Sequence, residues 1–149
     1  MSINEKDSFV YLGIEFKVKG RDFLEAQYQR SLKKAEKYVF AILNTTKDSQ
    51  DQSLVTRSLW KFVAIPAVMY GMEACVLSGK VLNDLEKLQK RIASFVTGLP
   101  IEGGNTALWL ESGIMPMKAR YHIMFHRYFN RLMSLESGLI IEAPRGGLA

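Results

Sequence analysis

Residues 81–98, VLNDLEKLQKRIASFVTG, carry a complete set of signals for an amphipathic helix. At about 100° per residue, the large apolar side chains fall within roughly 100° of one another, which is the width of a core-facing stripe. They are Val81, Leu85, Leu88, Ile92, Phe95 and Val96. Ser78 is a good N-cap, and Gly98 followed by Pro100 ends the helix. Because this stripe must be buried, other segments of the chain have to cover it.

Two other long segments have the same period and can provide that cover. A helix over residues 22–43, capped by Asp22, places on one face Leu24, Tyr28, Leu32, Ala35, Val39 and Ile42. The last helix is expected to begin at Pro116 and to end near Glu136. Its broad apolar stripe consists of Met117, Tyr121, Met124, Phe125, Tyr128, Phe129, Leu132 and Leu135. Both patterns favour helix packing against helix.

Residues 53–73 form a less regular helical segment. The predicted stripe consists of Leu54, Ser58, Phe62, Ile65 and Met69. After Phe62 the segment is apolar all round, which places its second half at the centre of the fold. Pro66 should kink the helix or end it near Ile65, because proline removes a backbone donor and clashes with the preceding turn.

The run FVYLGIEFKV, residues 9–18, is the only strong strand signal. A single strand must pair, and no second clear strand follows, so its partner sheet is expected upstream in a longer polypeptide. A short helix opens at Asn105 and closes at Gly113. The sequence predicts a mainly α fold, a bundle of about four longer helices plus one short helix, with one N-terminal β strand or short hairpin. We divide it into an N-terminal strand region at 1–20, a helical region at 21–136 and a tail at 137–149.

Composition predicts one intracellular domain without a membrane segment. The chain has 149 residues and a net charge of +5, which is compatible with a polyanionic partner. Its single cysteine, Cys75, cannot form an internal disulfide, so a reducing compartment is the default. The N-terminal residues are polar and show no secretory signal. The longest apolar run, residues 62–77, contains Pro66, Gly71 and Glu73 and is shorter than the roughly 20 residues of a bilayer span.

Three arginines of the last helix form the most suggestive charge pattern. Arg120, Arg127 and Arg131 lie within about 40° of one another on a helix, and no carboxylate occurs from Pro116 to Ser134. An ordinary solvated face usually interleaves acids with bases. This face is therefore expected to contact phosphates, with a solvated or partner-docking surface as the alternative.

Two other helices carry basic residues with acids among them. The first helix gathers opposite its apolar face Arg30, Lys33, Lys34 and Lys37, close to Glu36. The helix at residues 81–98 has on one flank Lys80, Asp84, Lys87 and Arg91, at a spacing that permits internal ion pairs. We interpret as further candidate nucleic-acid contacts Arg30, Lys33, Lys34, Lys37, Lys87 and Arg91. The alternative is again a solvated surface.

Patterns for catalysis or metal binding are missing from the sequence. His122 and His126 are four residues apart, but no Glu stands between them as in H-E-x-x-H, and no third ligand follows at a useful spacing. No Asp-Asp or Asp-x-Asp pair, P-loop or G-x-S-x-G motif occurs. We therefore predict no metal site, no cofactor and no catalytic centre in this chain.

Several segments, in order, resemble the region after the palm in reverse transcriptases of non-LTR (LINE-type) retrotransposons. Residues 9–14, FVYLGI, are similar to that family's F-x-Y-L-G strand. Residues 64–73, AIPAVMYGME, are similar to its I-x-P-x-x-x-Y-G-x-E helix, although Ile65 here directly precedes the proline. Residues 85–91, LEKLQKR, with GLP at 98–100, are similar to L-E-x-x-Q-x-R followed by G-L-P. Residues 107–120 resemble the family's short linker into a basic helix, and together these segments cover roughly residues 9–135.

The resemblance implies a thumb with a fragment of the primer-grip strand, here Tyr11, Leu12 and Gly13. The family's palm aspartates, which hold two Mg²⁺ ions, belong upstream of Phe9, so Mg²⁺ is expected only in that missing palm. The implied partners are the RNA/DNA template-primer duplex and the upstream palm domain of the same polyprotein, with no membrane and no small-molecule substrate. The hypothesis is a non-catalytic thumb fragment that holds the duplex through phosphate contacts. The alternative is a helical protein-protein interaction or structural module whose basic faces are only solvated.

Overall fold

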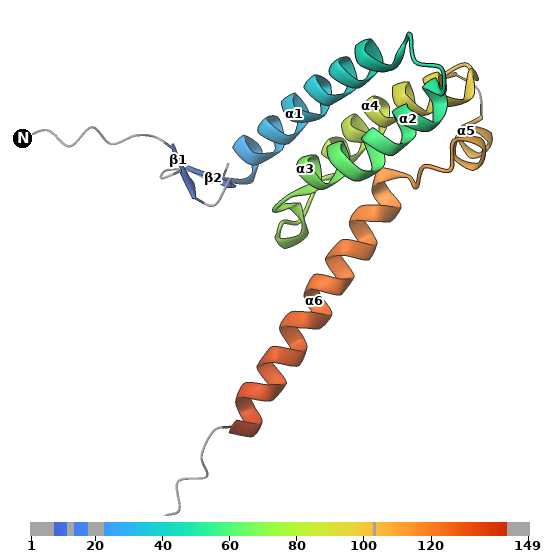
Figure 1. Cartoon of the computed structure of the whole chain (residues 1–149). Coiled ribbons are helices and arrows are strands. Elements are labelled where there is room, and N and C mark those ends of the chain that lie inside the picture. The colour runs from blue at the N-terminus through green and yellow to red at the C-terminus, as the bar shows by residue number, and fades with distance from the viewer. Residues whose placement is uncertain (1–7, 12–13, 18–22, 103, 143–149) are drawn as a thin grey trace, which may run out of the picture.

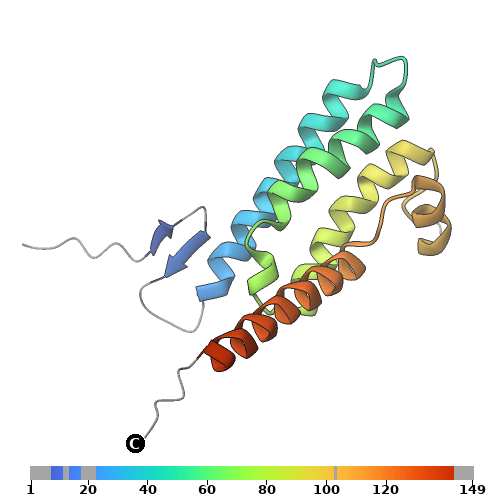
Figure 2. The same ribbon diagram turned by 60° about the horizontal axis from the view of Figure 1, so that its bottom comes forward.

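The computed structural model describes residues 8–11, 14–17, 23–102 and 104–142 and is mainly helical, as predicted (Figure 1). The α-helices are α1 (Phe23–Thr46), α2 (Gln52–Leu59), α3 (Ile65–Met69), α4 (Gly79–Thr97), α5 (Asn105–Ser112) and α6 (Met117–Glu142). A π-helical segment, η1 (Trp60–Ala64), joins α2 to α3, and a 3-10 turn, η2 (Met72–Ala74), follows α3. Helix α1, the α2–η1–α3 segment and α4 lie side by side and form the body of the bundle (Figure 2).

Two short strands precede the helices. β1 (Ser8–Tyr11) and β2 (Ile14–Lys17) are antiparallel, with Phe9 opposite Phe16. Residues 1–7, 12–13 and 18–22 lie outside the described residues. The expected strand region at 1–20, its pairing with an upstream sheet and the Asp22 cap therefore stay predictions.

Helix α1 packs against α4 and the α2–α3 segment with the face predicted from its period. Its buried apolar residues are Tyr28, Ala35, Val39 and Ile42, and Leu32 is partly buried against them. The helix extends to Thr46, three residues beyond the expected end. Thr46 is buried, and its Oγ1 donates to the Ile42 carbonyl at 2.8 Å and lies 2.6 Å from Thr56 Oγ1. This polar contact holds the end of α1 against the start of α2.

The stripe predicted for residues 53–73 is wrong in its first half. Leu54 and Phe62 are exposed, whereas Thr56, Trp60 and Ala64 are fully buried. One reason is that Thr56 is satisfied by Thr46, so a polar residue occupies a position expected to be apolar. The other is that the turn of η1 is wider than an α-helical turn. The residues before η1 are therefore rotated relative to those after it, and a single α-helical period cannot fit both halves.

The disturbance expected at Pro66 takes the form of this wider turn. The Ile65 N–H donates to the Trp60 carbonyl, five residues back, instead of four. A π turn relieves the clash between a proline ring and the carbonyl of the preceding turn. Pro66 then lies in the first turn of α3, which ends at Met69, and Gly71 adopts the left-handed φ of +76° needed to reverse the chain.

Helix α4 has the boundaries that its sequence signals predict. Ser78 accepts a hydrogen bond from the Val81 N–H at 3.4 Å, and Gly98 ends the helix with a φ of +71°. Of the predicted stripe, Val81, Leu85 and Ile92 are buried, whereas the other three are only partly buried, namely Leu88, Phe95 and Val96. The buried face is completed by Leu82, Gln89 and Ala93.

Gln89 is a fully buried polar residue that joins three parts of the fold. Its Oε1 accepts a hydrogen bond from Trp60 Nε1 at 3.2 Å, and its Nε2 donates to the Met115 carbonyl at 2.9 Å. Trp60 is also fully buried. The hydrogen bonds tie η1, α4 and the connection between α5 and α6 together through the core.

Helix α6 begins in the core and then projects from the bundle (Figure 1). Met117 and Tyr121 are buried, and the Tyr121 hydroxyl donates to the Cys75 carbonyl at 2.9 Å and accepts from the Leu77 N–H at 3.1 Å. We call residues 126–142 the distal segment. The predicted stripe is wrong there as a core face, because several of its members are exposed, namely Phe129, Leu132 and Leu135. The helix ends at Glu142, so 137–142 are helical instead of tail; the next helix-breaking proline is Pro144.

Candidate nucleic-acid interface

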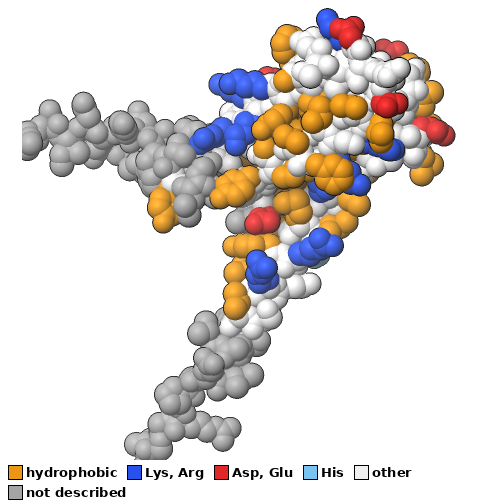
Figure 3. All heavy atoms as spheres, in the orientation of Figure 1, with side chains coloured by type: hydrophobic (Ala, Val, Ile, Leu, Met, Phe, Trp, Pro, Cys, Tyr) orange, Lys and Arg blue, Asp and Glu red, His pale blue; other side chains and the backbone are white. Residues whose placement is uncertain are grey.

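The three arginines of α6 lie on one side of the helix but in two environments. Arg127 and Arg131 are exposed on the distal segment, and neither has an ion pair or hydrogen bond through its side chain within the described residues. Figure 3 shows Lys and Arg side chains beside hydrophobic ones on this projecting helix. Arg120, at the base of α6, is half-buried instead and lines a cavity beneath α3 and η2. Arg120 therefore differs in burial from Arg127 and Arg131, although the helical period places all three on one side of α6.

The basic cluster of α1 faces the basic row of α4 across a shared groove. On α1, Lys33 and Lys37 are exposed, and Arg30 and Lys34 are partly buried. Lys33 and Lys87 line one groove of about 410 Å³, together with Glu36 and Asp84. Lys87 Nζ lies 3.0 Å from Asp84 Oδ1, as the spacing allowed. The seam between α1 and α4 thus carries both signs of charge and is a weaker attractor for a polyanion than α6.

A second groove gathers lysines that the sequence did not group. It has a volume of about 420 Å³ and is lined from α4, α5 and α6 by Asn83, Glu86, Lys87, Lys90, Asn105, Trp109 and Lys118. We call this the lysine groove. Glu86 is the one acid among these lining residues, and its Oε2 accepts a hydrogen bond from the Lys118 N–H at 3.3 Å. Three lysines, two amides and a half-buried tryptophan can contact phosphates and sugars.

Single-helix periodicity could not reveal the lysine groove, because Lys90 and Lys118 come from different helices. The partial signal was the run of cations in LEKLQKR, residues 85–91. Arg91, which was predicted as a contact, is exposed on α4 and does not line the groove. Of the predicted α4 residues, the structure places only Lys87 there.

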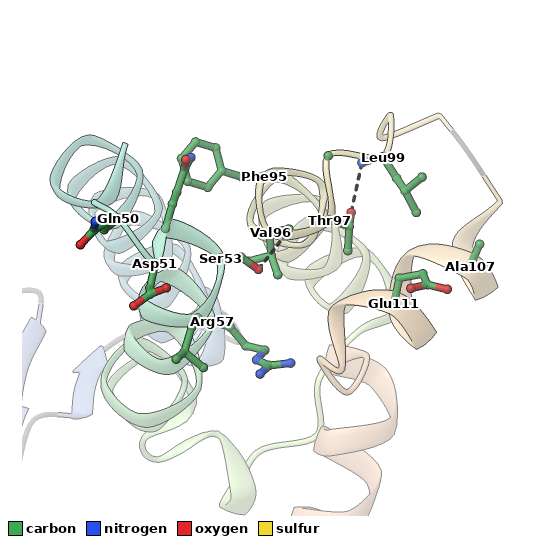
Figure 4. A pocket seen from close by; sticks show the side chains of 13 residues that line it. Gln50, Asp51, Ser53, Arg57, Phe95, Val96, Thr97, Leu99, Ala107 and Glu111 are labelled. Atoms are coloured by element: carbon green, nitrogen blue, oxygen red, sulfur yellow. Dashed lines mark hydrogen bonds between the residues drawn. The ribbon is translucent and has the colours of Figure 1, made fainter. Parts of the chain in front are cut away.

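The largest cavity described here, about 940 Å³, opens between the start of α2, the end of α4 and α5 (Figure 4). Arg57, which was not predicted as a site residue, points into this cavity. Its Nη1 lies close to Gly113, since a Cβ placed on that glycine would be 3.4 Å away. Asp51 and Glu111 line the same cavity, and neither forms an ion pair with Arg57. Because two carboxylates accompany one guanidinium, this cavity is a poor match for a polyanion.

The remaining predicted site residues gain little from the structure. Tyr11 is exposed, and Leu12 and Gly13 lie outside the described residues. His122 and His126 are both exposed on α6. Among the residues that the structure describes, no group of three or more His, Cys, Asp or Glu side chains could hold a metal ion.

No protein-family model, curated protein or solved structure matches this chain. Within the described part of the chain, no helix combines the length and apolar character needed to cross a bilayer. Any inference about ligands therefore rests on the side chains described above. Arg127 and Arg131, which have no partner among the described residues, and the lysine groove can each bind anionic groups.

Proposed function

We propose that the chain is the thumb of a reverse transcriptase of the non-LTR retrotransposon type, and that it holds a template-primer duplex without catalysing nucleotide transfer. One observation carries the proposal: α6 presents Arg127 and Arg131 to solvent with no acidic partner in the described residues. The order of the sequence motifs supports it independently. Catalysis would belong to an upstream palm, and the location would be intracellular.

Phosphate contacts explain why clustered cations are useful without base-reading residues. Side chains that bind phosphates fix the position of a duplex and carry no sequence information. An RNA/DNA hybrid would be recognised through its shape and backbone. The main contacts would come from Arg127 and Arg131. The lysine groove, Arg30, Lys33, Lys34, Lys37 and Arg91 would be weaker ones, because acids lie among them.

Salt dependence tests this proposal. If about four phosphates are neutralised, the logarithm of the association constant should fall with the logarithm of salt concentration with a slope of about −3 to −4. The measurement is fluorescence anisotropy of a labelled RNA/DNA duplex with the full chain over a salt series. A flat series, or no binding at low salt, rules the proposal out.

Charge reversal locates the contacts. The double variant Arg127→Glu, Arg131→Glu should weaken binding and make the salt slope shallower by about two. The matched control is Lys47→Glu, Lys61→Glu, which changes net charge equally at exposed positions outside the proposed interface. Equal loss in both variants would show that net charge alone governs binding.

A second candidate function, docking to a protein partner, is favoured by the apolar side of the distal segment. Its exposed residues are Phe129, Leu132, Met133 and Leu135. A phosphate backbone does not cover such side chains, whereas a palm domain or another protein surface could. The triple variant Arg120→Glu, Arg127→Glu, Arg131→Glu separates the candidates. If duplex affinity is unchanged while association with a palm fragment is lost, the docking function is correct.

A further inference from the structure

Arg120 is a half-buried cation that forms no ion pair among the described residues. Its Nε is inaccessible to water and has no hydrogen-bond partner among the described residues. Burial lowers the pKa of its guanidinium below the usual value, because the charged form loses solvation. Charged groups are rarely buried in folded proteins unless they are paired. An anion supplied from outside the chain would provide the missing partner.

The cavity beside Arg120 has a size and lining suited to one nucleotide unit. Its volume is about 280 Å³, near the lower limit of ligand pockets, so it is too small for a stretch of duplex. Ile65, Met69 and Met124 give it apolar walls. Tyr70 lines it with a side chain that is 54% exposed, at the turn where Gly71 reverses the chain.

The exposed Tyr70 side chain lies at the same cavity as the Arg120 guanidinium. Aromatic side chains that accompany a cation at such a cavity are the usual platform for unpaired bases, since every base has a flat face that can stack. A base inside a duplex is already stacked and cannot reach a platform. The combination of Tyr70 and Arg120 therefore favours a nucleotide at a strand end or at a junction with single strand.

We propose that this cavity binds one unpaired nucleotide of the bound nucleic acid, with its phosphate on Arg120 and its base stacked on Tyr70. This inference rests on the proposed function and adds the part of the nucleic acid that is recognised. It also gives Arg120 a role different from that of Arg127 and Arg131, which would contact phosphates along the duplex.

Glu73 offers a competing explanation, because its carboxylate lines the same cavity. A change of rotamer could make it the partner of Arg120, although the structure shows it exposed and without an ion pair to Arg120. The variant Glu73→Gln separates the two. If the anion comes from outside, removing this carboxylate should tighten nucleic-acid binding. If Glu73 is the partner, the variant should lower thermal stability and leave affinity no better.

The test compares two probes with the full chain, by fluorescence anisotropy at one salt concentration. One is a blunt RNA/DNA duplex, and the other is the same duplex with a short single-stranded extension. The extended probe should bind at least about fivefold more tightly, from the stacking of one base. Tyr70→Ala should abolish this preference, and the control Tyr70→Phe should retain it because the ring is kept.

Arg120→Lys should also reduce the preference, since lysine cannot form the two-pronged contact of a guanidinium with phosphate. Tyr70 is exposed, so its variants test the inference even if changes at Arg120 impair folding. Equal affinity of the wild-type chain for both probes, or an unchanged preference in Tyr70→Ala, overturns this inference and leaves duplex binding in place. Absence of salt-dependent binding to either probe overturns the proposed function, and this inference with it.

Discussion

The base and the distal segment of α6 have the same amphipathic pattern but differ in what covers them. At the base, Met117 and Tyr121 are 0% and 5% exposed, and Tyr121 bonds to two backbone groups of the segment after η2. In the distal segment, Phe129 and Leu135 are 51% and 59% exposed. An apolar stripe therefore shows that a surface must be covered, but not that the same chain covers it.

The same contrast applies to charge. Arg120 at the base is partly desolvated and has no ion pair among the described residues, whereas Arg127 and Arg131 remain in water. A desolvated cation gains more from one well-placed anion than an exposed one, because the surrounding dielectric is lower. The base is thus suited to a specific contact and the distal segment to general attraction.

The largest expected loss of stability comes from removing Trp60, the fully buried aromatic residue of the bundle core against which the exposed distal segment is compared. Trp60→Ala should lower the free energy of unfolding by about 3 to 5 kcal/mol, because it opens a cavity and leaves Gln89 Oε1 without its donor. Phe129→Ala in the distal segment should change it by less than about 0.5 kcal/mol. Urea denaturation followed by circular dichroism measures both. A cost of several kcal/mol for Phe129→Ala would mean that the distal segment is covered in solution.

Two tyrosines of α6 allow a matched comparison. Tyr121→Phe should destabilise the fold by about 2 to 3 kcal/mol, since the Cys75 carbonyl and Leu77 N–H are buried and lose their partner. Tyr128→Phe should be nearly neutral, because the Tyr128 hydroxyl has no bond within the described residues. Thermal unfolding of both variants provides the test. Similar losses at the two positions would contradict the difference drawn between base and distal segment.

A smaller effect is expected at the buried amide. Gln89→Leu keeps the side chain near its original size but leaves the Trp60 indole N–H without an acceptor, which should cost about 1 to 2 kcal/mol. Asn130→Leu, at an exposed site of the distal segment, is the control and should change stability by less than about 0.5 kcal/mol. Urea midpoints at constant m-value give the comparison. A gain in stability for Gln89→Leu would show that the buried hydrogen bonds are replaceable by apolar packing.

The smallest effect is a decline of stability at alkaline pH through Cys75. Burial raises the pKa of this thiol above its ordinary value, because desolvation disfavours the thiolate. As pH rises, the Cys75 thiol therefore loses its proton in the unfolded chain before it does so in the folded one. Its contribution to the free energy of unfolding is complete below about pH 8.5 and shrinks as pH rises through the higher pKa of the folded state. Unfolding curves of wild type and Cys75→Ala should diverge less at pH 10 than at pH 7. An equal divergence at both pH values would contradict this prediction.

Local signals were enough to predict the boundaries of α4 and the buried face of α1. Ser78 and Gly98 act through backbone geometry within a single helix, so no tertiary information is needed. The buried positions of α2 and η1 could not be predicted, because each depends on a partner from another helix. Thr56 is hydrogen-bonded to Thr46 of α1, and the Trp60 indole donates to Gln89 of α4. Hydrophobic periodicity assigns such polar residues to the surface.

The candidate interface was predictable only within single helices. Arg120, Arg127 and Arg131 share a side of α6 because of their spacing, but the partial burial of Arg120 depends on η2, which packs against α6. The lysine groove combines residues of α4 and α6 that are about thirty positions apart in sequence, and no local pattern records that proximity. Arg57 was overlooked because its cavity exists only once α2, α4 and α5 meet.

Helix α6 is long and is held to the rest of the fold near its N-terminal end, around Tyr121. Its 26 residues span about 39 Å, and the part beyond Tyr121 about 30 Å. A tilt of the helix by about 10° around Tyr121 would move its far end by about 5 Å, roughly the rise of one helical turn. The hydrogen bonds of the Tyr121 hydroxyl, together with the packing of Met117, Met124 and Phe125, therefore help to set the position of the far end of α6.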